Sequence, residues 1–291
     1  MRNKEREKFL ILLVGILFLI FLITESVNWK NSKEEPLKVS YLDVGQGDAT
    51  LISYLGRYQI LIDGGPSGSK LLTQLEKEMP ILDKNIEIVI LTHPDLDHLA
   101  GLIDVLRNYK VEIFLENGQV ADTNIFRELE SVLQQKQIKR KVALEGSEFS
   151  IGEELSFKVF NPDKVETRDV NRNENSIVLR MEFGENSFLF TGDATNKTEI
   201  DMIDDRENVD ADWLKLGHHG SKHSSSLNFL KEVSPQVAIA SAGKNNRYKH
   251  PNKEVVDALN ELDIELLRTD LLGTINIVCV SPTEECLFRR E

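Results

Sequence analysis

The sequence predicts an α/β fold in which two β-sheets carry helices on their outer faces. Two observations indicate it. Short, hairpin-rich strands alternate with helices, and this order occurs twice along the 291 residues. The most clearly marked strand, 86–91, is rich in β-branched residues and uninterrupted after Glu87, as expected for a strand that is covered on both faces.

The N-terminus adds a predicted membrane anchor. Basic residues occupy every second position of the first eight, and an uncharged apolar run follows them. We expect a cytoplasmic basic tail (1–8), one transmembrane helix that serves as a signal anchor (9–29) and a linker (30–38). A cleaved signal peptide is the alternative. By the positive-inside rule, the remaining domain (39–291) of this single-pass protein would face outward from the cell membrane.

The first half of the domain predicts hairpin strands followed by alternating helices and strands. Short runs rich in β-branched and aromatic residues indicate the strands, and apolar residues three or four positions apart indicate the helices. The expected strands are 40–44, 49–54, 58–62, 86–91 and 111–115. The expected helices are 69–77, 99–109 and 124–136.

The second half repeats this order. The expected strands are 149–151, 155–160, 176–183, 187–189, a short run ending at Leu216, and 237–241. The expected helices are 195–203, 224–233 and 251–262. Near the C-terminus, Cys279 and Cys286 flank a predicted hairpin turn. They would either form a disulfide across two strands or pack as reduced, apolar residues.

Four side chains that can bind a metal ion follow the best-marked strand within one short turn. They are His93, Asp95, Asp97 and His98. Imidazole and carboxylate groups together suit a divalent ion such as zinc or manganese. Helix capping by one aspartate is the alternative, but it leaves two histidines and a second aspartate unexplained. The sequence therefore predicts a metal site at this strand end.

Two further strand ends carry the same chemistry. Asp193 follows the apolar run 188–190, and the doublet His218-His219 follows a third strand and stands between glycines. Five of the six histidines lie at the two strand ends that carry histidine. A turn-forming role explains Asp193 alone equally well, but it does not explain this concentration of histidines beside carboxylates.

These motifs resemble the metallo-β-lactamase fold superfamily, and within it the soluble hydrolase-like domain of the ComEC competence proteins. The signatures occur in the expected order at 43–49, 61–65, 93–98, 175–179, 191–193, 218–221 and 241–251. The resemblance covers nearly everything from Val39 onward. It implies a four-layer αββα sandwich.

The resemblance also implies a centre with two divalent ions, zinc or manganese. The ligands that it implies are His93, Asp95, Asp97, His98, Asp193 and His218. Asp193 would bridge the two ions, and His219 is the alternative to His218 as the distal ligand. A further histidine of the superfamily is missing from 171–175, so the first site, at His93 and Asp95, would be rich in oxygen ligands and weak.

In this centre, Asp97 and Asp193 would orient an attacking hydroxide, and His219 would stabilise charge on the substrate as a third catalytic residue. The side chains expected to bind substrate are Ser221, Lys222, Asn246 and His250. Lys244, Arg247 and Lys249 form either a basic patch for an anionic substrate or an ordinary solvated loop.

The function expected is hydrolysis of an anionic phosphodiester, with DNA as the substrate suggested by the ComEC branch. A cell-envelope phosphodiester, such as teichoic acid or a phosphocholine ester, is the alternative within the same chemistry. The net charge of −13 repels long polyanions, so a nucleic-acid contact would be local and metal-assisted. A non-catalytic binding or regulatory module is a third reading. No protein partner is assigned.

Overall fold

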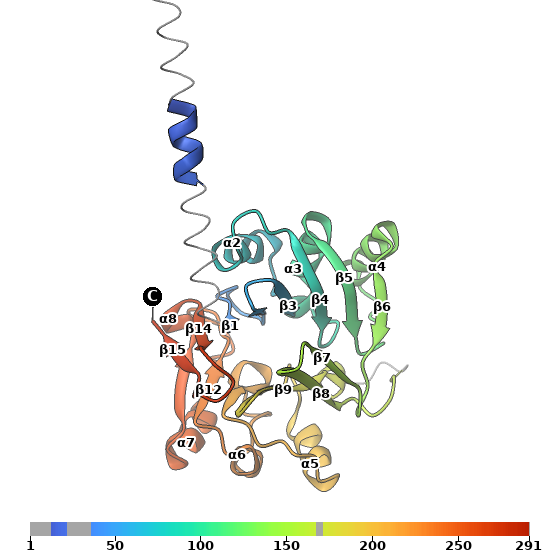
Figure 1. Cartoon of the computed structure of the whole chain (residues 1–291). Helices are drawn as coiled ribbons and strands as arrows, with labels where there is room; N and C mark the ends of the chain where they lie inside the picture. Colours follow the sequence, from blue (N-terminus) through green and yellow to red (C-terminus); the bar gives the residue numbers. More distant parts are fainter. Residues whose placement is uncertain (1–12, 22–35, 167–170, 291) are drawn as a thin grey trace, which may run out of the picture.

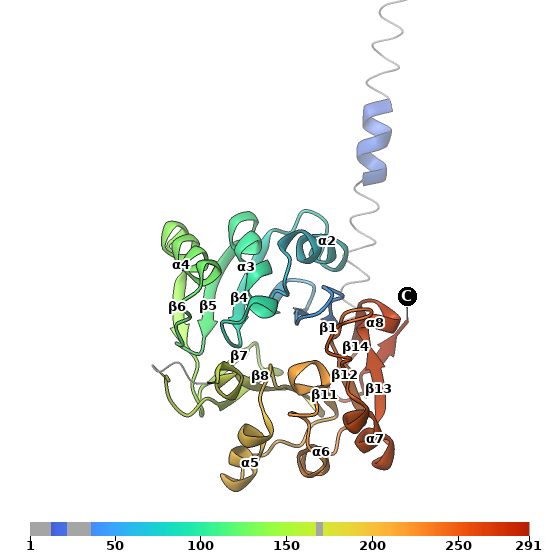
Figure 2. The same ribbon diagram turned by 180° about the vertical axis from the view of Figure 1, so that it is seen from behind.

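The protein is described here from a computed structural model, which describes residues 13–21, 36–166 and 171–290. Two β-sheets pack face to face, and helices cover the outer face of each (Figure 1). The view from behind shows the same four layers, with α2, α3 and α4 on one side and α5, α6 and α7 on the other (Figure 2). The αββα sandwich expected from the sequence is confirmed.

The first sheet has eight strands among the described residues, in the order β15-β14-β1-β2-β3-β4-β5-β6. In that order they span Leu287–Arg289, Ile275–Cys279, Leu37–Tyr41, Thr50–Tyr54, Tyr58–Ile62, Asn85–Leu91, Lys110–Glu116 and Lys139–Val142. Strands β3 to β6 are parallel, whereas the others pair antiparallel. The helices on its outer face are α2 (Gly68–Glu78), α3 (Leu96–Asn108) and α4 (Asn124–Lys136).

The second sheet has seven described strands, in the order β13-β12-β11-β10-β9-β8-β7. They span Glu265–Arg268, Val237–Ala240, Trp213–Lys215, Asn186–Phe190, Val178–Phe183, Leu155–Asn161 and Glu148–Ile151. The helices beside them are α5 (Asn196–Asp204), α6 (Leu227–Val233), α7 (Lys253–Glu261) and α8 (Thr269–Leu272). Two short 3₁₀ helices, η1 (Arg172–Asn175) and η2 (Gly217–Gly220), lie in its loops.

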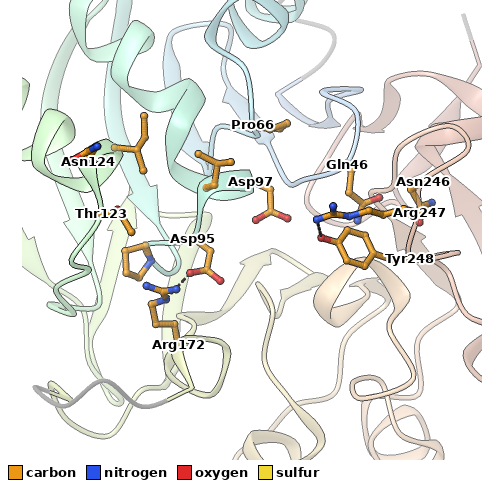
Figure 3. Close-up of a pocket in the computed structure, with 13 residues that line it drawn as sticks. Gln46, Pro66, Asp95, Asp97, Thr123, Asn124, Arg172, Asn246, Arg247 and Tyr248 are labelled. Atoms are coloured by element: carbon orange, nitrogen blue, oxygen red, sulfur yellow. Dashed lines mark hydrogen bonds and ion pairs between the residues drawn. The ribbon is translucent and has the colours of Figure 1, made fainter.

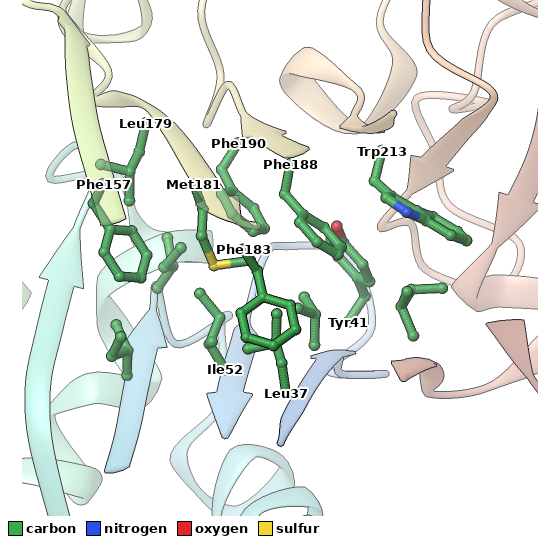
Figure 4. Packing of buried hydrophobic residues seen from close by; sticks show 14 of the residues in the cluster. Leu37, Tyr41, Ile52, Phe157, Leu179, Met181, Phe183, Phe188, Phe190 and Trp213 are labelled. Atoms are coloured by element: carbon green, nitrogen blue, oxygen red, sulfur yellow. The ribbon is translucent and has the colours of Figure 1, made fainter. Parts of the chain in front are cut away.

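Large apolar side chains fill the space between the two sheets. Phe183 and Phe188 of the second sheet pack with Leu37 and Tyr41 of the first, and all four are fully buried (Figure 4). Separate apolar clusters lie beneath the two outer helix layers. Full burial of one such side chain stabilises the fold by about 1.5–3 kcal/mol, so these clusters fix how the sheets face each other.

The parallel strands bring several loops to one edge of the sandwich. Strands β3, β4 and β5 run parallel in one sheet, and β10, β11, β12 and β13 do so in the other. Because the carboxyl ends of parallel strands lie at the same edge of a sheet, the loops that follow β3, β4, β10 and β11 can aim side chains at one point.

Several element boundaries differ from the sequence prediction. Strand β1 begins at Leu37, inside the segment predicted as a linker, because Leu37 is fully buried against the second sheet. Strand β6 was not predicted. All its side chains are exposed at the sheet edge, so it lacks the apolar alternation of a half-buried strand. Cys279 and Cys286 form a disulfide, which settles the two alternatives left by the sequence.

Little of the predicted membrane anchor is described by the structure. Residues 13–21 are helical with exposed side chains, whereas 9–12 and 22–29 lie outside the described residues, as do the basic tail and most of the linker. No helix in the described ranges is long and apolar enough to cross a bilayer.

One glycine governs how closely α3 packs on the loop after β3. A Cβ atom at Gly101 would lie 1.9 Å from the carbonyl oxygen of Gly64, and the amide of Gly101 donates to the carbonyl oxygen of Gly65 at 2.9 Å. The loop can therefore approach the helix only where the helix has no side chain. This contact places Asp63, the residue before Gly64, beside the start of α3.

Replacing Gly101 by alanine tests this contact. Alanine is the better helix former by about 1 kcal/mol, but the clash with backbone should dominate. We expect Gly101→Ala to lower the free energy of unfolding by about 1–3 kcal/mol in urea denaturation. Asn108→Ala, at an exposed position of the same helix, is the control and should change it by less than about 0.5 kcal/mol. A Gly101→Ala variant as stable as the native protein would contradict the account.

Candidate metal centre

The loop from β4 to α3 carries the first histidine and aspartate side chains. Strand β4 ends at Leu91, and His93 follows it, fully buried. Asp95 is the N-cap residue of α3, but its side chain accepts no hydrogen bond from the helix backbone. One carboxylate oxygen of Asp95 instead lies 3.8 Å from Nε2 of His93. Helix capping therefore does not account for Asp95.

Five side chains from three strand ends meet beside this loop. Nε2 of His98 lies 3.3 Å from Oδ1 of Asp193. Nε2 of His219 lies 3.4 Å from Oδ2 of Asp97 and 3.8 Å from Oδ2 of Asp193. Nε2 of His93 lies 3.9 Å from the same Asp193 oxygen. Within the described residues, none of these three Nε2 atoms, nor Asp193 Oδ1, has a hydrogen-bond partner.

These unpartnered atoms fit divalent metal ions. Leaving polar atoms buried without partners is costly, and four of them here converge on one place. Zinc binds nitrogen ligands at about 2.0–2.1 Å with tetrahedral geometry, which puts neighbouring ligand atoms roughly 3.3 Å apart. The ligand atoms of His93, His98 and Asp193 lie within 4.8 Å of one another, as do those of Asp97, His98 and His219. The donor set thus suits the ions that the superfamily resemblance implies.

Two buried carboxylates contact the imidazoles of His98 and His219 at Nδ1, on the side of each ring that faces away from the centre. Oδ2 of Asp63 lies 2.8 Å from Nδ1 of His98, and Oδ1 of Asp48 lies 2.9 Å from Nδ1 of His219. A carboxylate in this position accepts the Nδ1 proton, so Nε2 faces the centre and its lone pair becomes free for an ion once the Nε2 proton leaves. This arrangement fixes both the tautomer and the ring orientation that a metal ligand needs.

Hydroxyl groups hold the third imidazole. Oγ1 of Thr92 lies 3.1 Å and Oγ of Ser176 3.3 Å from Nδ1 of His93. Thr92 also donates to Asp63 through its hydroxyl and its backbone amide, at 2.7 and 2.8 Å. The supports of His93 and His98 are therefore parts of one hydrogen-bond network.

The loop that carries Asp48 approaches the centre through a glycine. Gly47 has φ +146°, and a Cβ atom there would lie 2.4 Å from the carbonyl oxygen of Asp97. The amide of Asp48 donates to that same carbonyl oxygen at 3.2 Å. The ammonium group of Lys215, which is buried, pairs with the second oxygen of Asp48 and donates to the carbonyl oxygen of Gly192. Asp48 is thus held between a backbone contact and two cationic side chains.

The histidine doublet differs from the predicted ligand assignment. His219 is buried and lies beside Asp97 and His98, whereas the side chain of His218 is 32% exposed and belongs to none of the ligand groups in the described chain. His218 and His219 both have left-handed backbone, with φ of 48° and 59°, and their rings diverge at 73°. The geometry therefore favours His219, the alternative distal ligand, over His218.

The segment in which a histidine was expected and is missing forms η1 beside the centre. Nε of Arg172 lies 2.6 Å from Oδ1 of Asp95. The side-chain amide of Asn173 lies 3.3 Å from Nδ1 of His218. This segment therefore contacts two predicted ligands from outside and supplies no imidazole of its own.

The carboxylates and imidazoles shift each other's proton affinity. Burial and the nearby His98 lower the pKa of His93 to about 3. Burial also disfavours charge on His98 and His219, but Asp193 and the carboxylates behind the rings outweigh it. They hold the pKa of His98 well above its ordinary value and raise the pKa of His219 to about 9. Burial raises the pKa of Asp193, yet the histidines hold it well below its usual range.

A cleft of about 810 Å³ opens over the centre. Asp95 and Asp97 lie in its middle, Arg172 and Thr123 line one side, and Arg247 and Tyr248 line the other (Figure 3). The guanidinium of Arg247 lies 4.7 Å from the ring centre of Tyr248. The cleft thus reaches the centre through its two more exposed aspartates, with one arginine on each side.

The four residues predicted to bind substrate have different positions. Asn246 lines the cleft, but its side-chain amide bonds the backbone of Gly243 and His250. His250 is buried, with its ring 5.6 Å from that of His218. Ser221 is buried next to the doublet, and Lys222 is exposed. Asn246 therefore shapes its loop, and His250 is the one of the four that packs against the histidine doublet.

Sequence reasoning missed the supporting residues. Asp48 and Asp63 lie within the family signatures at 43–49 and 61–65, but the sequence indicates no role for them. It indicates none for Lys215 and Ser176 either. The signal for all four is similar: a polar residue placed inside, or close to one end of, an apolar strand pattern. Such a residue must find a partner when it is buried.

An αββα sandwich with a cluster of candidate metal-binding histidines and aspartates at its shared strand ends suggests a metal-dependent hydrolase-like domain. The model of the metallo-β-lactamase superfamily matches residues 42–244, and the chain belongs to this superfamily. The chain is 33% identical over 261 residues to ComE operon protein 3 of Bacillus subtilis, covering 82% of this chain and 32% of that protein.

Other relatives are also competence proteins or named for recombination. The chain is 33% identical to Recombination protein 2 of Haemophilus influenzae and 29% identical to competence protein ComA of Neisseria gonorrhoeae. These matches cover 94% and 83% of this chain but 32% of each relative, so the chain spans about a third of their length. The predicted resemblance to ComEC-like competence proteins is confirmed.

Solved structures show the same fold at low sequence identity. The metallo-β-lactamase fold protein YhfI of Bacillus subtilis matches with a TM-score of 0.56 and 15% identity, over 80% of this chain and 96% of that one. Igni18, a metallo hydrolase of Ignicoccus hospitalis, matches with a TM-score of 0.56 and 16% identity, over 82% and 97%.

The raised pKa values predict that metal binding releases protons. His98 and His219 are charged near pH 7 without an ion, and metal ligands must be deprotonated. We expect the release of about two protons per chain at pH 7, falling as the pH rises past about 9, with tighter binding at higher pH. Isothermal titration calorimetry in two buffers of different ionisation enthalpy measures this release. Binding at pH 7 without proton release would contradict the assignment.

Proposed function

We propose that this chain is a metal-dependent phosphodiesterase that works with two divalent ions, zinc or manganese. The observation that carries the proposal is the convergence of the Nε2 atoms of His93, His98 and His219 on Asp193. These atoms are buried and unpartnered within the described residues, while the Nδ1 atoms are held from behind. Such an arrangement is typical of histidines that bind metal ions and not of histidines that only pack in a core.

The chemistry divides between the ions and the side chains. Bound ions would lower the pKa of a water molecule and polarise a phosphoryl oxygen. Asp97, whose side chain is 35% exposed at the floor of the cleft, and Asp193 would orient the attacking water. His219, which lies between them, would stay fixed by Asp48 and keep their spacing.

The cleft suits an anionic substrate although the protein is acidic overall. Arg172 and Arg247 stand on opposite sides of the two aspartates, so a phosphodiester lying across the centre would meet a guanidinium on either side. The net charge of −13 opposes long-range attraction of a polyanion. Local contacts would therefore decide which phosphodiester binds.

DNA is the first candidate substrate, because relatives at 29–33% identity are named as competence and recombination proteins. The chain spans about a third of their length, so DNA transport is not part of the proposal. A teichoic acid or phosphocholine ester of the cell envelope is the second candidate. It is favoured by the acidic charge and by the predicted anchor, which would place the domain outside the cell membrane.

Removing the shared carboxylates tests the enzymatic proposal. We expect Asp97→Asn and Asp193→Asn to lower the rate at which bis-p-nitrophenyl phosphate is hydrolysed, with zinc or manganese supplied, by more than about 100-fold. This loss is larger than the one expected when a residue that only supports a metal ligand is removed. Asp122→Asn is the matched control, since its side chain is fully exposed and it belongs to none of the ligand groups among the described residues. Hydrolysis is followed by release of p-nitrophenol.

The same preparation should be tested on single-stranded DNA, double-stranded DNA and teichoic acid. Cleavage of DNA alone supports the nuclease reading, and cleavage of teichoic acid alone supports the envelope reading. An intact protein that binds ions yet hydrolyses none of these esters would favour a non-catalytic module.

A further inference from the structure

The edge of the first sheet opposite the metal centre exposes three large apolar side chains. Leu55 lies in the turn between β2 and β3, and Ile81 and Leu82 lie in the loop before β4. Because β3 and β4 are neighbouring parallel strands, both loops lie at their amino ends, whereas the metal centre lies at their carboxyl ends. The three side chains are 50, 69 and 81% exposed. Single exposed apolar residues are ordinary, but three on two adjoining loops indicate a contact surface.

The backbone at Leu55 is one that leucine disfavours. The amide of Arg57 donates to the carbonyl oxygen of Tyr54 at 3.1 Å and closes a two-residue hairpin turn. Leu55 and Gly56 in this turn both have positive φ, 55° and 59°. Hairpins of this kind favour Asn-Gly at these two positions, so the turn itself does not explain a leucine.

The backbone at Leu82 is disfavoured in the same way. The amide of Asp83 donates to the carbonyl oxygen of Pro80 at 3.0 Å, which closes a second tight turn. Leu82 is the third residue of this turn and has φ of 70°, a conformation that favours glycine or asparagine. Two turns at one edge of the sheet thus present a leucine where local folding favours a smaller or polar residue.

The chain enters this same edge from the predicted membrane anchor. Leu37, the first residue of β1, pairs with Tyr54 next to the hairpin turn, and the carbonyl oxygen of Pro36 accepts from the amide of Leu55 at 2.6 Å. Six residues, 30–35, separate Pro36 from the anchor predicted at 9–29. Fully extended, six residues span at most about 20 Å. The predicted anchor would therefore hold this edge, and not the opposite one, near the bilayer.

A cation stacked on a tyrosine ring accompanies each leucine. The guanidinium of Arg57 lies 5.0 Å from the ring centre of Tyr58, and Nζ of Lys84 lies 4.6 Å from that of Tyr109. Nζ of Lys84 also lies 3.9 Å from the exposed carboxylate of Glu76. Tyrosine and basic side chains are typical of the layer where lipid headgroups meet water.

We infer that the loops of Leu55, Ile81 and Leu82 form a lipid-binding surface that seats the domain on the bilayer. The three apolar side chains enter the headgroup boundary, and the neighbouring cations meet lipid phosphates. Strand β4, with seven residues, holds the metal centre about 20 Å farther from the lipid. The cleft therefore receives its substrate outside the headgroup layer. The inference rests on the predicted anchor and does not depend on the reaction catalysed.

The test uses the full chain in vesicles of phosphatidylglycerol and phosphatidylethanolamine in equal parts, with a nitroxide label on one introduced cysteine. The native cysteines form a disulfide and do not react. A label at Ile81→Cys should collide with oxygen dissolved in the lipid and be shielded several-fold from a water-soluble nickel chelate. A label at Val120→Cys is the matched control, because Val120 is an exposed apolar residue in the loop after β5, at the carboxyl ends of the strands. The chelate should reach it freely.

Replacing both leucines tests the surface itself. With Leu55→Asn and Leu82→Asn together, the nickel chelate should reach the label at position 81 several-fold more readily. Asparagine tolerates left-handed backbone, so the two substitutions should not lower the free energy of unfolding in urea. This measurement also shows that the variant has folded.

Shielding of the label at position 81 that the two asparagines remove supports the inference. Equal access of the chelate to the labels at 81 and 120 overturns it, as does shielding that the asparagines leave unchanged. A label shielded from both oxygen and the chelate would indicate a protein contact and also overturns it. A chain that does not float with the vesicles overturns it as well, because the anchor is then lacking. No hydrolysis is measured, so failure here is distinct from failure of the proposed phosphodiesterase.

Discussion

The hydrogen bonds that hold the buried imidazoles through Nδ1 are the interaction on which the rest of this site depends. An imidazole can bind a metal ion through Nε2 only when its proton sits on Nδ1 and its ring is fixed. Asp63 and Asp48 impose both conditions on His98 and His219. Without them, the buried rings could turn or change tautomer, and their Nε2 atoms would no longer converge on Asp193.

The fold buries both carboxylates beside groups that compensate their negative charge. Asp48 pairs with Lys215 and His219, while Asp63 pairs with His98 and accepts two bonds from Thr92. When a divalent ion replaces the protons of two charged histidines, the total charge of the centre is unchanged. The buried carboxylates therefore stay compensated in charge either with two protons or with one divalent ion at the centre.

Much of the fold followed from the sequence, because its strands are apolar and its helices amphipathic. Strand β3 and helix α4 have the predicted bounds. Strand β6 was missed because an exposed edge strand has no apolar pattern. The short β13 was missed because its four residues, of which only Leu267 is buried, are too few to show an alternating pattern.

The site was predictable in composition but not in detail. The clustering of histidines and aspartates at strand ends predicted a metal centre near His93 and Asp193. It could not predict which member of the doublet faces Asp97, because that depends on the left-handed backbone of two adjacent residues. Nor could it predict that Asp48, 45 positions before His93 in the sequence, would lie behind His219.

The most direct test of the central claim is a crystal structure of the protein grown with Mn²⁺ or Zn²⁺, with anomalous scattering used to locate the ions. The account predicts anomalous density in contact with the Nε2 atoms of His98 and His219, while their Nδ1 atoms remain bonded to Asp63 and Asp48. Density elsewhere, or rings that bind the ion through Nδ1, would contradict it.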